Sequence, residues 1–287
     1  MNPAWWLLYS ALGCHGSLDG LLEAKAPFLV HGYQSPDGHS WTRTGPAIAG
    51  GFSSLGAVVS DDEVLITGLP ATPPTWWEER FPSLFVATLV SPDGLSWATR
   101  RLSVEAPGTA LIDPQLVMGP DGLELWFVQA EGTGDPGQGQ RETRLVRTRQ
   151  LRPHAAEYGK AELWYTGRGL VDVAPVWLNG ELRVYATRGH SEIVEIAEVN
   201  GQKTERVIVG GVTVPFPLAH AGGVWLWGQA PVDGGMRPVR LNSADGRTWS
   251  APEALVRDPT VTSCASPVVV PWRAAWRLWC VEEPGRR

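Results

Sequence analysis

The sequence has no run of 18 or more apolar residues, so no transmembrane helix is expected. Basic residues are not in excess either, because 24 Lys and Arg stand against 30 Asp and Glu, for a net charge of −6. A surface for nucleic acid needs a stripe of positive charge, so nucleic acid is not an expected partner. Long helical periods are also scarce, which argues against a helical fold.

The sequence is rich in turn formers and tryptophan, with 33 Gly, 24 Pro and 15 Trp. This composition favours many short strands joined by tight turns. The chain has 287 residues, of which 43% are apolar, and this is enough to bury one large core. We therefore expect a single all-β domain, and we expect it to be a monomer.

One seven-residue phrase occurs three times, as SPDGHSW at 35–41, SPDGLSW at 91–97 and SADGRTW at 243–249. The Ser-x-Asp-Gly core suits a hairpin turn, since Gly tolerates positive φ and the Ser and Asp side chains can bond nearby backbone N–H groups. Asp37 and Asp93 are 56 residues apart, and Asp93 and Asp245 are 152 apart, about three further units of similar length. Such a period is typical of propellers and solenoids.

A second pattern, which occurs five times, is a pair of apolar strands joined by a turn. Four of the five copies begin with a small, acidic or aromatic residue followed by Pro. A second hairpin follows each of the first four copies, and the segment 26–48 supplies the hairpin that the last copy lacks. The sequence therefore predicts five four-stranded blades starting near residues 53, 110, 170, 212 and 261, with the ring closed by the N-terminal hairpin. The copies span residues 55–68, 113–128, 174–187, 216–228 and 266–281.

These motifs resemble two groups of known propellers. The three repeated phrases are similar to the Asp boxes of sialidase-like propellers, although each is one residue shorter. The five-blade count and the Asp-Pro inner strands resemble the glycoside hydrolases that include arabinanases, xylosidases, invertases and levansucrases. The resemblance implies a site on the face around the central channel, and places the Asp boxes on the opposite face in a structural role.

The N-terminal segment 4–12, AWWLLYSAL, is a short apolar stretch followed by Gly13 and Cys14. It resembles a bacterial lipoprotein signal peptide that ends at a lipidated cysteine. We expect a signal peptide at 1–14, a linker at 15–25 and the propeller at 26–287, with the lipid on Cys14 as the only link to a membrane. The alternative is a first β-strand or a disordered start.

The other two cysteines allow a test of export. Cys264 and Cys280 flank a predicted hairpin, whose folding would bring them side by side on adjacent strands. In an oxidising compartment they can form a disulfide.

Candidate catalytic residues follow from the resemblance, because glycosidases need one carboxyl group as acid and a second as base or nucleophile. Asp113 matches the second-blade Asp-Pro, and Asp172 lies near the place of the third-blade acid, where Val173 occupies the usual Glu slot. The first-blade Asp has no counterpart, since Ser53 and Ser54 stand there. A loop carboxylate, for which we select Glu79, would complete the set. The alternative is that Asp113 and Asp172 only cap turns.

The channel face should also carry Phe216 and Ser263 at the entries to the last two inner strands, together with long loops. The loop after residue 70 holds Trp76 and Trp77 beside Arg80, and an aromatic plane near charged groups suits a sugar ring. The alternative is that these Trp side chains fill a blade. The predicted substrate-binding residues are Trp76, Trp77, Arg80, Glu131, Arg188 and His190. His190 and His220 lack partners at ligand spacing, so neither a metal nor another cofactor is expected.

The favoured hypothesis is an exported propeller that binds a poly- or oligosaccharide at its channel and hydrolyses it with Asp113, Asp172 and Glu79. The second hypothesis is a non-catalytic propeller that binds carbohydrate or protein on the same face. The third is an enzyme of another class on this scaffold.

Overall fold

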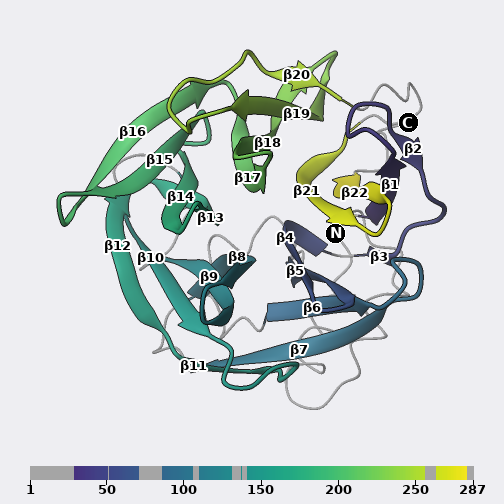
Figure 1. Cartoon of the computed structure of the whole chain (residues 1–287), viewed down its shortest axis with the longest axis horizontal. Helices are drawn as coiled ribbons and strands as arrows, with labels where there is room; N and C mark the ends of the chain where they lie inside the picture. Colours follow the sequence, from purple (N-terminus) through teal and green to yellow (C-terminus); the bar gives the residue numbers. More distant parts are fainter. Residues whose placement is uncertain are drawn as a thin grey trace, which may run out of the picture.

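The structure is a computed structural model that describes residues 29–50, 52–70, 86–105, 110–130, 137, 141–255 and 263–282. The regular elements in these residues are all β-strands, arranged in five sheets around a central axis (Figure 1). The predicted all-β, five-bladed propeller is thus confirmed. No helix in the described part of the chain has the length and apolarity to cross a lipid bilayer.

Each blade begins with an inner strand and proceeds outward. Blade 1 contains β4 (Phe52–Ser60), β5 (Glu63–Pro70), β6 (Val86–Ser91) and β7 (Ala98–Glu105). Blade 2 contains β8 (Ala110–Gly119), β9 (Gly122–Ala130), β10 (Glu142–Arg149) and β12 (Glu162–Arg168). Blade 3 contains β13 (Leu170–Leu178), β14 (Glu181–Arg188), β15 (Glu192–Val199) and β16 (Gln202–Gly210). Blade 4 contains β17 (Thr213–His220), β18 (Gly223–Val232), β19 (Gly235–Ser243) and β20 (Glu253–Ala254).

Blade 5 joins the two ends of the described chain. Its inner strands are β21 (Ala265–Trp272) and β22 (Ala275–Glu282), and its outer strands are β1 (Leu29–Ser35) and β2 (Thr42–Arg43). β1 pairs with β22 along its whole length, from Leu29 opposite Glu282 to Ser35 opposite Trp276. The closure predicted from the sequence is therefore present, and it covers the outer edge of β22.

Two short strands depart from a strict four-stranded pattern. β3 (Ala49–Gly50) pairs with β1 in blade 5. β11 (Glu157–Lys160) lies between β10 and β12 in sequence, yet it pairs in parallel with β7 of blade 1. The segment between β10 and β12 of blade 2 thus adds a fifth strand to the sheet of blade 1, which the repeat pattern did not predict.

Aromatic side chains hold neighbouring blades together. The second strands of blades 2 to 5 each carry a buried aromatic at the same place, and blade 1 carries Thr67 there. The Trp that ends each repeated phrase packs edge-on against the aromatic of the preceding blade, with ring centroids 5.5–5.9 Å apart. The three pairs are Trp41 with Trp227, Trp97 with Trp279, and Trp249 with Tyr185.

The repeated phrases form turns between the third and fourth strands of blades 5, 1 and 4. In the first of them, Asp37 Oδ1 accepts hydrogen bonds from the backbone N–H groups of His39 and Ser40, at 2.8 and 2.9 Å. These bonds lower the pKa of the Asp37 carboxyl to about 2. Ser35 Oγ accepts from Gly38 N–H at 2.8 Å, which closes the turn.

An arginine of the preceding blade anchors each of these turns. Arg240 donates to the carbonyl oxygen of Gly38, Arg273 to that of Pro92, and Arg206 to that of Gly246, at 2.8–3.1 Å. The three turns thus have a structural use, and they lie at the end of the blades opposite the entries to the inner strands.

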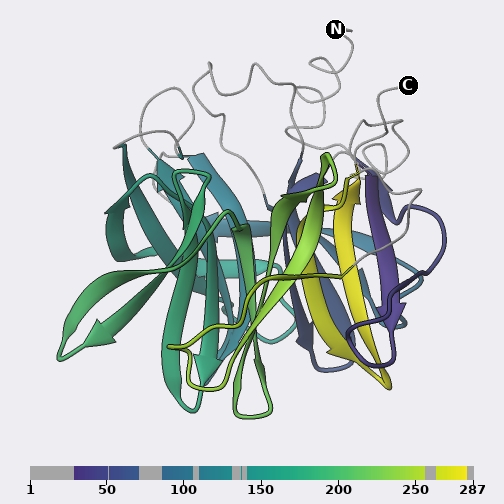
Figure 2. The same cartoon turned by 90° about the horizontal axis from the view of Figure 1, so that it is seen from above.

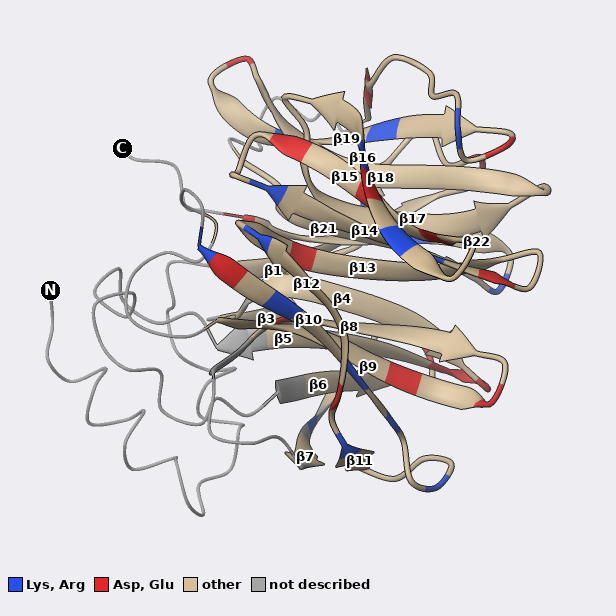
Figure 3. Ribbon diagram, turned by 90° about the vertical axis from the view of Figure 1, so that its left-hand side faces the viewer, with Lys and Arg blue, Asp and Glu red and all other residues tan. Residues whose placement is uncertain are grey.

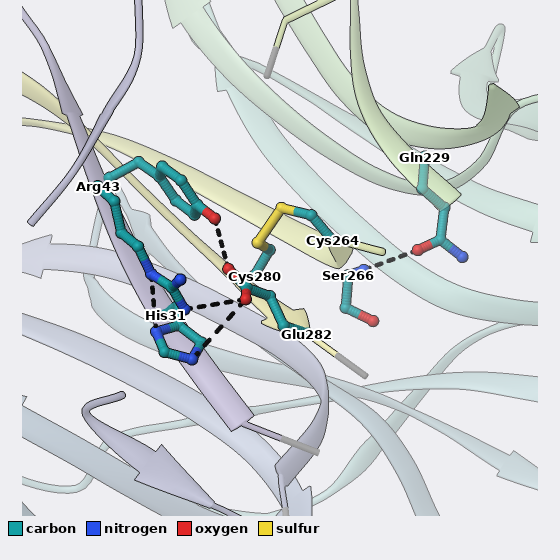
Figure 4. The surroundings of a disulfide bond; sticks show 8 residues. His31, Arg43, Gln229, Cys264, Ser266, Cys280 and Glu282 are labelled. Carbon is teal, nitrogen blue, oxygen red and sulfur yellow. Dashed lines mark hydrogen bonds and ion pairs between the residues drawn. A yellow bond between two sulfur atoms is a disulfide. The ribbon is translucent and has the colours of Figure 1, made fainter. Parts of the chain in front are cut away.

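The predicted disulfide is present between Cys264 and Cys280 (Figure 4). It joins the residue before β21 to the end of β22, and both cysteines are buried. Viewed from the side, the inner strands run roughly along the axis of the ring, and the outer strands are tilted away from it (Figures 1 and 2). Basic and acidic residues are interspersed over the side drawn in Figure 3.

Candidate functional site

A ring of five bulges marks the end of the channel where the inner strands begin. In each blade the pairing of the first two strands skips two residues, and the first skipped residue has a positive φ. We call these residues the bulge ring. They are Ser54, Asp113, Asp172, Val214 and Ser266, with φ between 49° and 54°.

Side chains of the preceding blade hold three of these bulges in place. The Val214 N–H donates to Thr187 Oγ1 at 2.8 Å, and the Ser266 N–H donates to Gln229 Oε1 at 2.7 Å (Figure 4). The left-handed conformation is costly for a β-branched residue such as Val214, so it requires support of this kind. The ring geometry is therefore set by contacts between blades.

Asp113 and Asp172 occupy equivalent ring positions in adjacent blades, and the structure brings them together. Asp113 Oδ2 accepts a hydrogen bond from the Asp172 N–H at 2.9 Å. Both residues are half-buried. The Asp113 carboxylate thereby fixes the backbone from which the Asp172 side chain extends, which is how a positioning group acts beside an acid.

The structure changes the assignment of the ring in blades 4 and 5. The sequence analysis placed Phe216 at the channel face, but the equivalent residue is Val214, and Phe216 is buried in the core. In blade 5 the equivalent residue is Ser266 rather than Ser263. In blades 2, 4 and 5 the bulge-ring residue directly precedes a Pro, and in blade 4 the prediction counted from Pro217 in place of Pro215.

His190 and Arg188 lie at the same end of blade 3, in and beside the turn between β14 and β15. The backbone at Gly137 lies against the His190 ring so closely that a Cβ there would be 2.2 Å from Nε2. His190 is thus beside Gly137, which lies between β9 and β10 in sequence. The guanidinium of Arg188 pairs with Glu192 at 2.6 Å and with Glu205 at 3.1 Å, and these hydrogen-bonded carboxylates raise its pKa.

Several predicted site residues lie outside the described residues. They are Trp76, Trp77, Glu79, Arg80, Glu131 and Cys14. His220 is described, and it stacks on Trp225 with ring centroids 3.9 Å apart, at the end of β17 away from the bulge ring. Among the described residues no group of three His, Cys, Asp or Glu side chains could hold a metal ion.

The sequence analysis missed Thr187 and Gln229, the side chains that hold the bulges of blades 4 and 5. Each follows the buried aromatic of its second strand by two residues, as Tyr185-Ala-Thr187 and Trp227-Gly-Gln229. That fixed offset is a signal that sequence comparison between blades can find.

No known family profile matches the sequence, and no curated protein matches it. Solved structures do match. An exo-1,5-α-L-arabinanase from a bovine ruminal metagenomic library aligns with a TM-score of 0.56 and 12% identity, over 81% of this chain and 92% of that one. The Bacillus subtilis arabinanase aligns with a TM-score of 0.54 and 10% identity, over 79% and 93%.

A third match is an exo-β-1,3-galactanase from Phanerochaete chrysosporium, with a TM-score of 0.52 and 13% identity, over 88% of this chain and 64% of that one. At such identities the likeness shows the fold and not the activity. The chain is a five-bladed propeller of the architecture that these arabinanases and this galactanase share, as the sequence resemblance implied.

Proposed function

We propose that the chain is a glycan-directed propeller that binds a poly- or oligosaccharide at the channel end carrying the bulge ring. The observation that supports this most is the pair Asp113 and Asp172, linked at 2.9 Å at equivalent positions of blades 2 and 3. Carboxylates and the hydroxyls of Ser54 and Ser266 are groups that can exchange hydrogen bonds with sugar hydroxyls. Proteins of the same fold include an arabinanase and a galactanase.

In the hydrolytic form of the proposal, Asp172 donates a proton to the leaving oxygen of the glycosidic bond, and Asp113 orients Asp172. Glu79 supplies the second carboxylate, as base or nucleophile. Trp76 and Trp77 stack on the sugar, and Arg80, Glu131, Arg188 and His190 bind its hydroxyls. Because Arg188 already pairs with Glu192 and Glu205, it can bond the sugar only through the guanidinium N–H groups that those two carboxylates do not use.

The test is a screen of the purified protein against arabinan, β-1,3-galactan and xyloglucan, measuring both retention and release of reducing ends. Asp172→Asn should abolish release and leave retention in place, whereas Trp76→Ala with Trp77→Ala should weaken retention. Asp121→Asn is the matched control, because Asp121 is exposed in the turn between β8 and β9, at the far end of the blade. Retention of no polysaccharide would exclude the proposal.

Binding without hydrolysis is the second candidate function, and one observation favours it. The bulge ring carries carboxylates at two positions only, since Ser54, Val214 and Ser266 occupy the others. If Glu79→Gln leaves retention unchanged and the wild-type protein releases no reducing ends, the site binds and does not cleave.

We also propose that the protein is exported, anchored through lipid on Cys14, and monomeric. The Cys264–Cys280 disulfide supports an oxidising compartment. Fractionation of cells that express the full chain, followed by mass spectrometry of the N-terminal peptide, tests the anchor. A soluble product with an unmodified Cys14 would exclude it, and size-exclusion chromatography with light scattering tests the monomer.

A further inference from the structure

A groove lies on the flank of the propeller, between the outer strands of blades 4 and 5. Its volume is about 710 Å³, which is within the range of ligand sites. The lining residues that matter here are Tyr33, His39, Ser40, Trp41, Arg43 and Glu253.

The two outer strands beside the groove are short. β2 and β20 have two residues each, while β7, β12 and β16 have seven to nine. Residues of both short strands, among them Thr42, Arg43 and Glu253, line the groove.

One end of the groove, toward the repeated turn, holds a cluster of Arg240, Glu253 and His39. The Arg240 guanidinium is 2% exposed and donates to Glu253 Oε2 at 3.2 Å and to His39 Nδ1 at 3.0 Å. Since guanidinium only donates, the imidazole nitrogen accepts. Arg240 Nε is buried and has no hydrogen-bond partner among the described residues.

The other end, toward the bulge ring, holds a second cluster of the same three residue types. Arg43 donates to Glu282 Oε2 at 2.9 Å and to His31 Nδ1 at 3.2 Å (Figure 4). His31 Nε2 lies 3.8 Å from Glu282 Oε2, and Tyr33 Oη donates to Glu282 Oε1. The groove therefore runs between two Arg-Glu-His clusters, with Trp41 and Ser40 among its lining residues.

The charges of this groove decide the class of its ligand. In each cluster the positive charge of one Arg is balanced by the negative charge of one Glu. Neither end therefore has a net charge that would attract a phosphate or a polyanion. What the groove does present is the hydroxyls of Ser40 and Thr42, an imidazole, partly exposed ionic groups and the partly exposed ring of Trp41. A neutral polyhydroxylated ligand uses all of these, through hydrogen bonds and ring contacts.

From these observations we infer that the flank groove is a second carbohydrate site, which binds a further stretch of the same neutral glycan as the channel. The inference rests on the proposed function for the identity of the glycan. The groove runs from Tyr33 and Arg43, which both bond Glu282 at the end of β22 nearer the bulge ring, to His39 and Ser40 in the repeated turn, so a long chain bound at the bulge ring can continue over blade 5. Two linked contacts raise the affinity for a polymer far more than for a short oligosaccharide.

The experiment compares Ser40→Tyr with Ser96→Tyr in the full chain, on arabinan, β-1,3-galactan and xyloglucan. Ser40 is exposed and lines the groove, while Ser96 is exposed at the same place of the repeated turn in blade 1. A tyrosine at 40 fills the groove without removing a member of either cluster. We expect Ser40→Tyr to weaken retention of the polymer about tenfold, with Ser96→Tyr unchanged.

Hydrogen exchange on the wild-type protein separates this inference from the proposed function. Saturating polymer should protect backbone amides at 39–43 and 253–255 as well as those at 111–115 and 170–174. Protection of the latter two segments alone, with equal retention by both tyrosine variants, overturns the flank site and leaves the channel site. Protection of the flank alone supports the groove and overturns the channel proposal. No protection by any of the three polymers overturns both.

Discussion

Arg43 donates a hydrogen bond to Glu282 across 2.9 Å, although 239 residues of chain separate the two. Glu282 also accepts from Tyr33, and its side chain is only 13% exposed. The carboxylate at the end of β22 thus links both β1 and β2 to the last described strand. The closure of the ring depends on polar contacts as well as on backbone pairing.

Glu282→Ala should therefore destabilise the whole propeller. Its removal leaves the buried hydroxyl of Tyr33 without this acceptor and the partly exposed guanidinium of Arg43 without its ion pair, at a cost of about 2 kcal/mol in the free energy of unfolding. Urea unfolding measures this. The control is Glu142→Ala, because Glu142 is 64% exposed in a surface pair with Arg144 and should change stability by about 0.5 kcal/mol or less. Equal effects of the two variants would contradict the role of Glu282.

The stability of the fold should fall as the pH drops from 6.5 to 4. Burial, and secondarily the charge of Arg43, lower the pKa of His31 from 6.5 to about 4. The carboxylate of Glu282 favours the charged ring, but Arg43 and Tyr33 share it. The unfolded chain binds a proton at this residue below pH 6.5 and the folded chain does not, so up to about 3 kcal/mol is lost by pH 4.

Urea unfolding at pH 7, 5.5 and 4 checks this, with His31→Gln as the variant that lacks the titration. If the free energy of unfolding falls with pH as steeply in His31→Gln as in the wild type, the assignment to His31 is refuted.

The carboxyl groups of the repeated turns act at lower pH. The pKa values of Asp37 and Asp245 are lowered to about 2, so their contribution to stability is lost only below pH 3.8.

Removal of the disulfide should cost about 3 kcal/mol, the chain-entropy estimate for a loop of this length. The two cysteines are 16 residues apart in sequence. Cys264→Ser combined with Cys280→Ser should unfold at lower urea than the wild type and should not respond to dithiothreitol. A wild-type protein whose midpoint is the same with and without the reductant would disprove the stabilisation.

Ser54→Asp should raise the release of reducing ends by about 100-fold, the usual contribution of a positioned general base. Ser54 occupies the bulge-ring position of blade 1, where the enzymes that the sequence resembles carry an Asp, and Asp tolerates its φ of 49°. Ser266→Asp is the matched control, because Ser266 has the same φ of 49° in blade 5. The same gain in both variants, or in neither, would argue against a carboxylate requirement at blade 1.

The number of blades followed from the sequence because it depends on local signals, and the closure followed from the count of hairpins, since the last strand pair lacks one and the segment 26–48 supplies it. A turn phrase such as 35–41 specifies its own hydrogen bonds, and an apolar strand pair specifies its own hairpin. The disulfide followed for the same reason, since Cys264 and Cys280 flank one hairpin. Features within one blade are encoded over a few tens of residues.

Contacts between blades were harder to predict. Nothing in the neighbourhood of Val214 indicates that Thr187 bonds its N–H group, and the two prolines at 215 and 217 left the ring position ambiguous between Val214 and Phe216. The two Arg-Glu-His clusters combine residues as distant as His39 and Arg240, 201 positions apart. Such groups become visible only once the ring is assembled.

The pairing of β1 with β22 also has a consequence during synthesis. The ribosome delivers β1 before the other blades, but its partner strand β22 is translated after all the other described strands. Until then β1 has exposed backbone donors and acceptors, a state that invites aggregation and chaperone binding. Contacts spanning 249 residues, such as Tyr33 with Glu282, further imply a slow final step of folding.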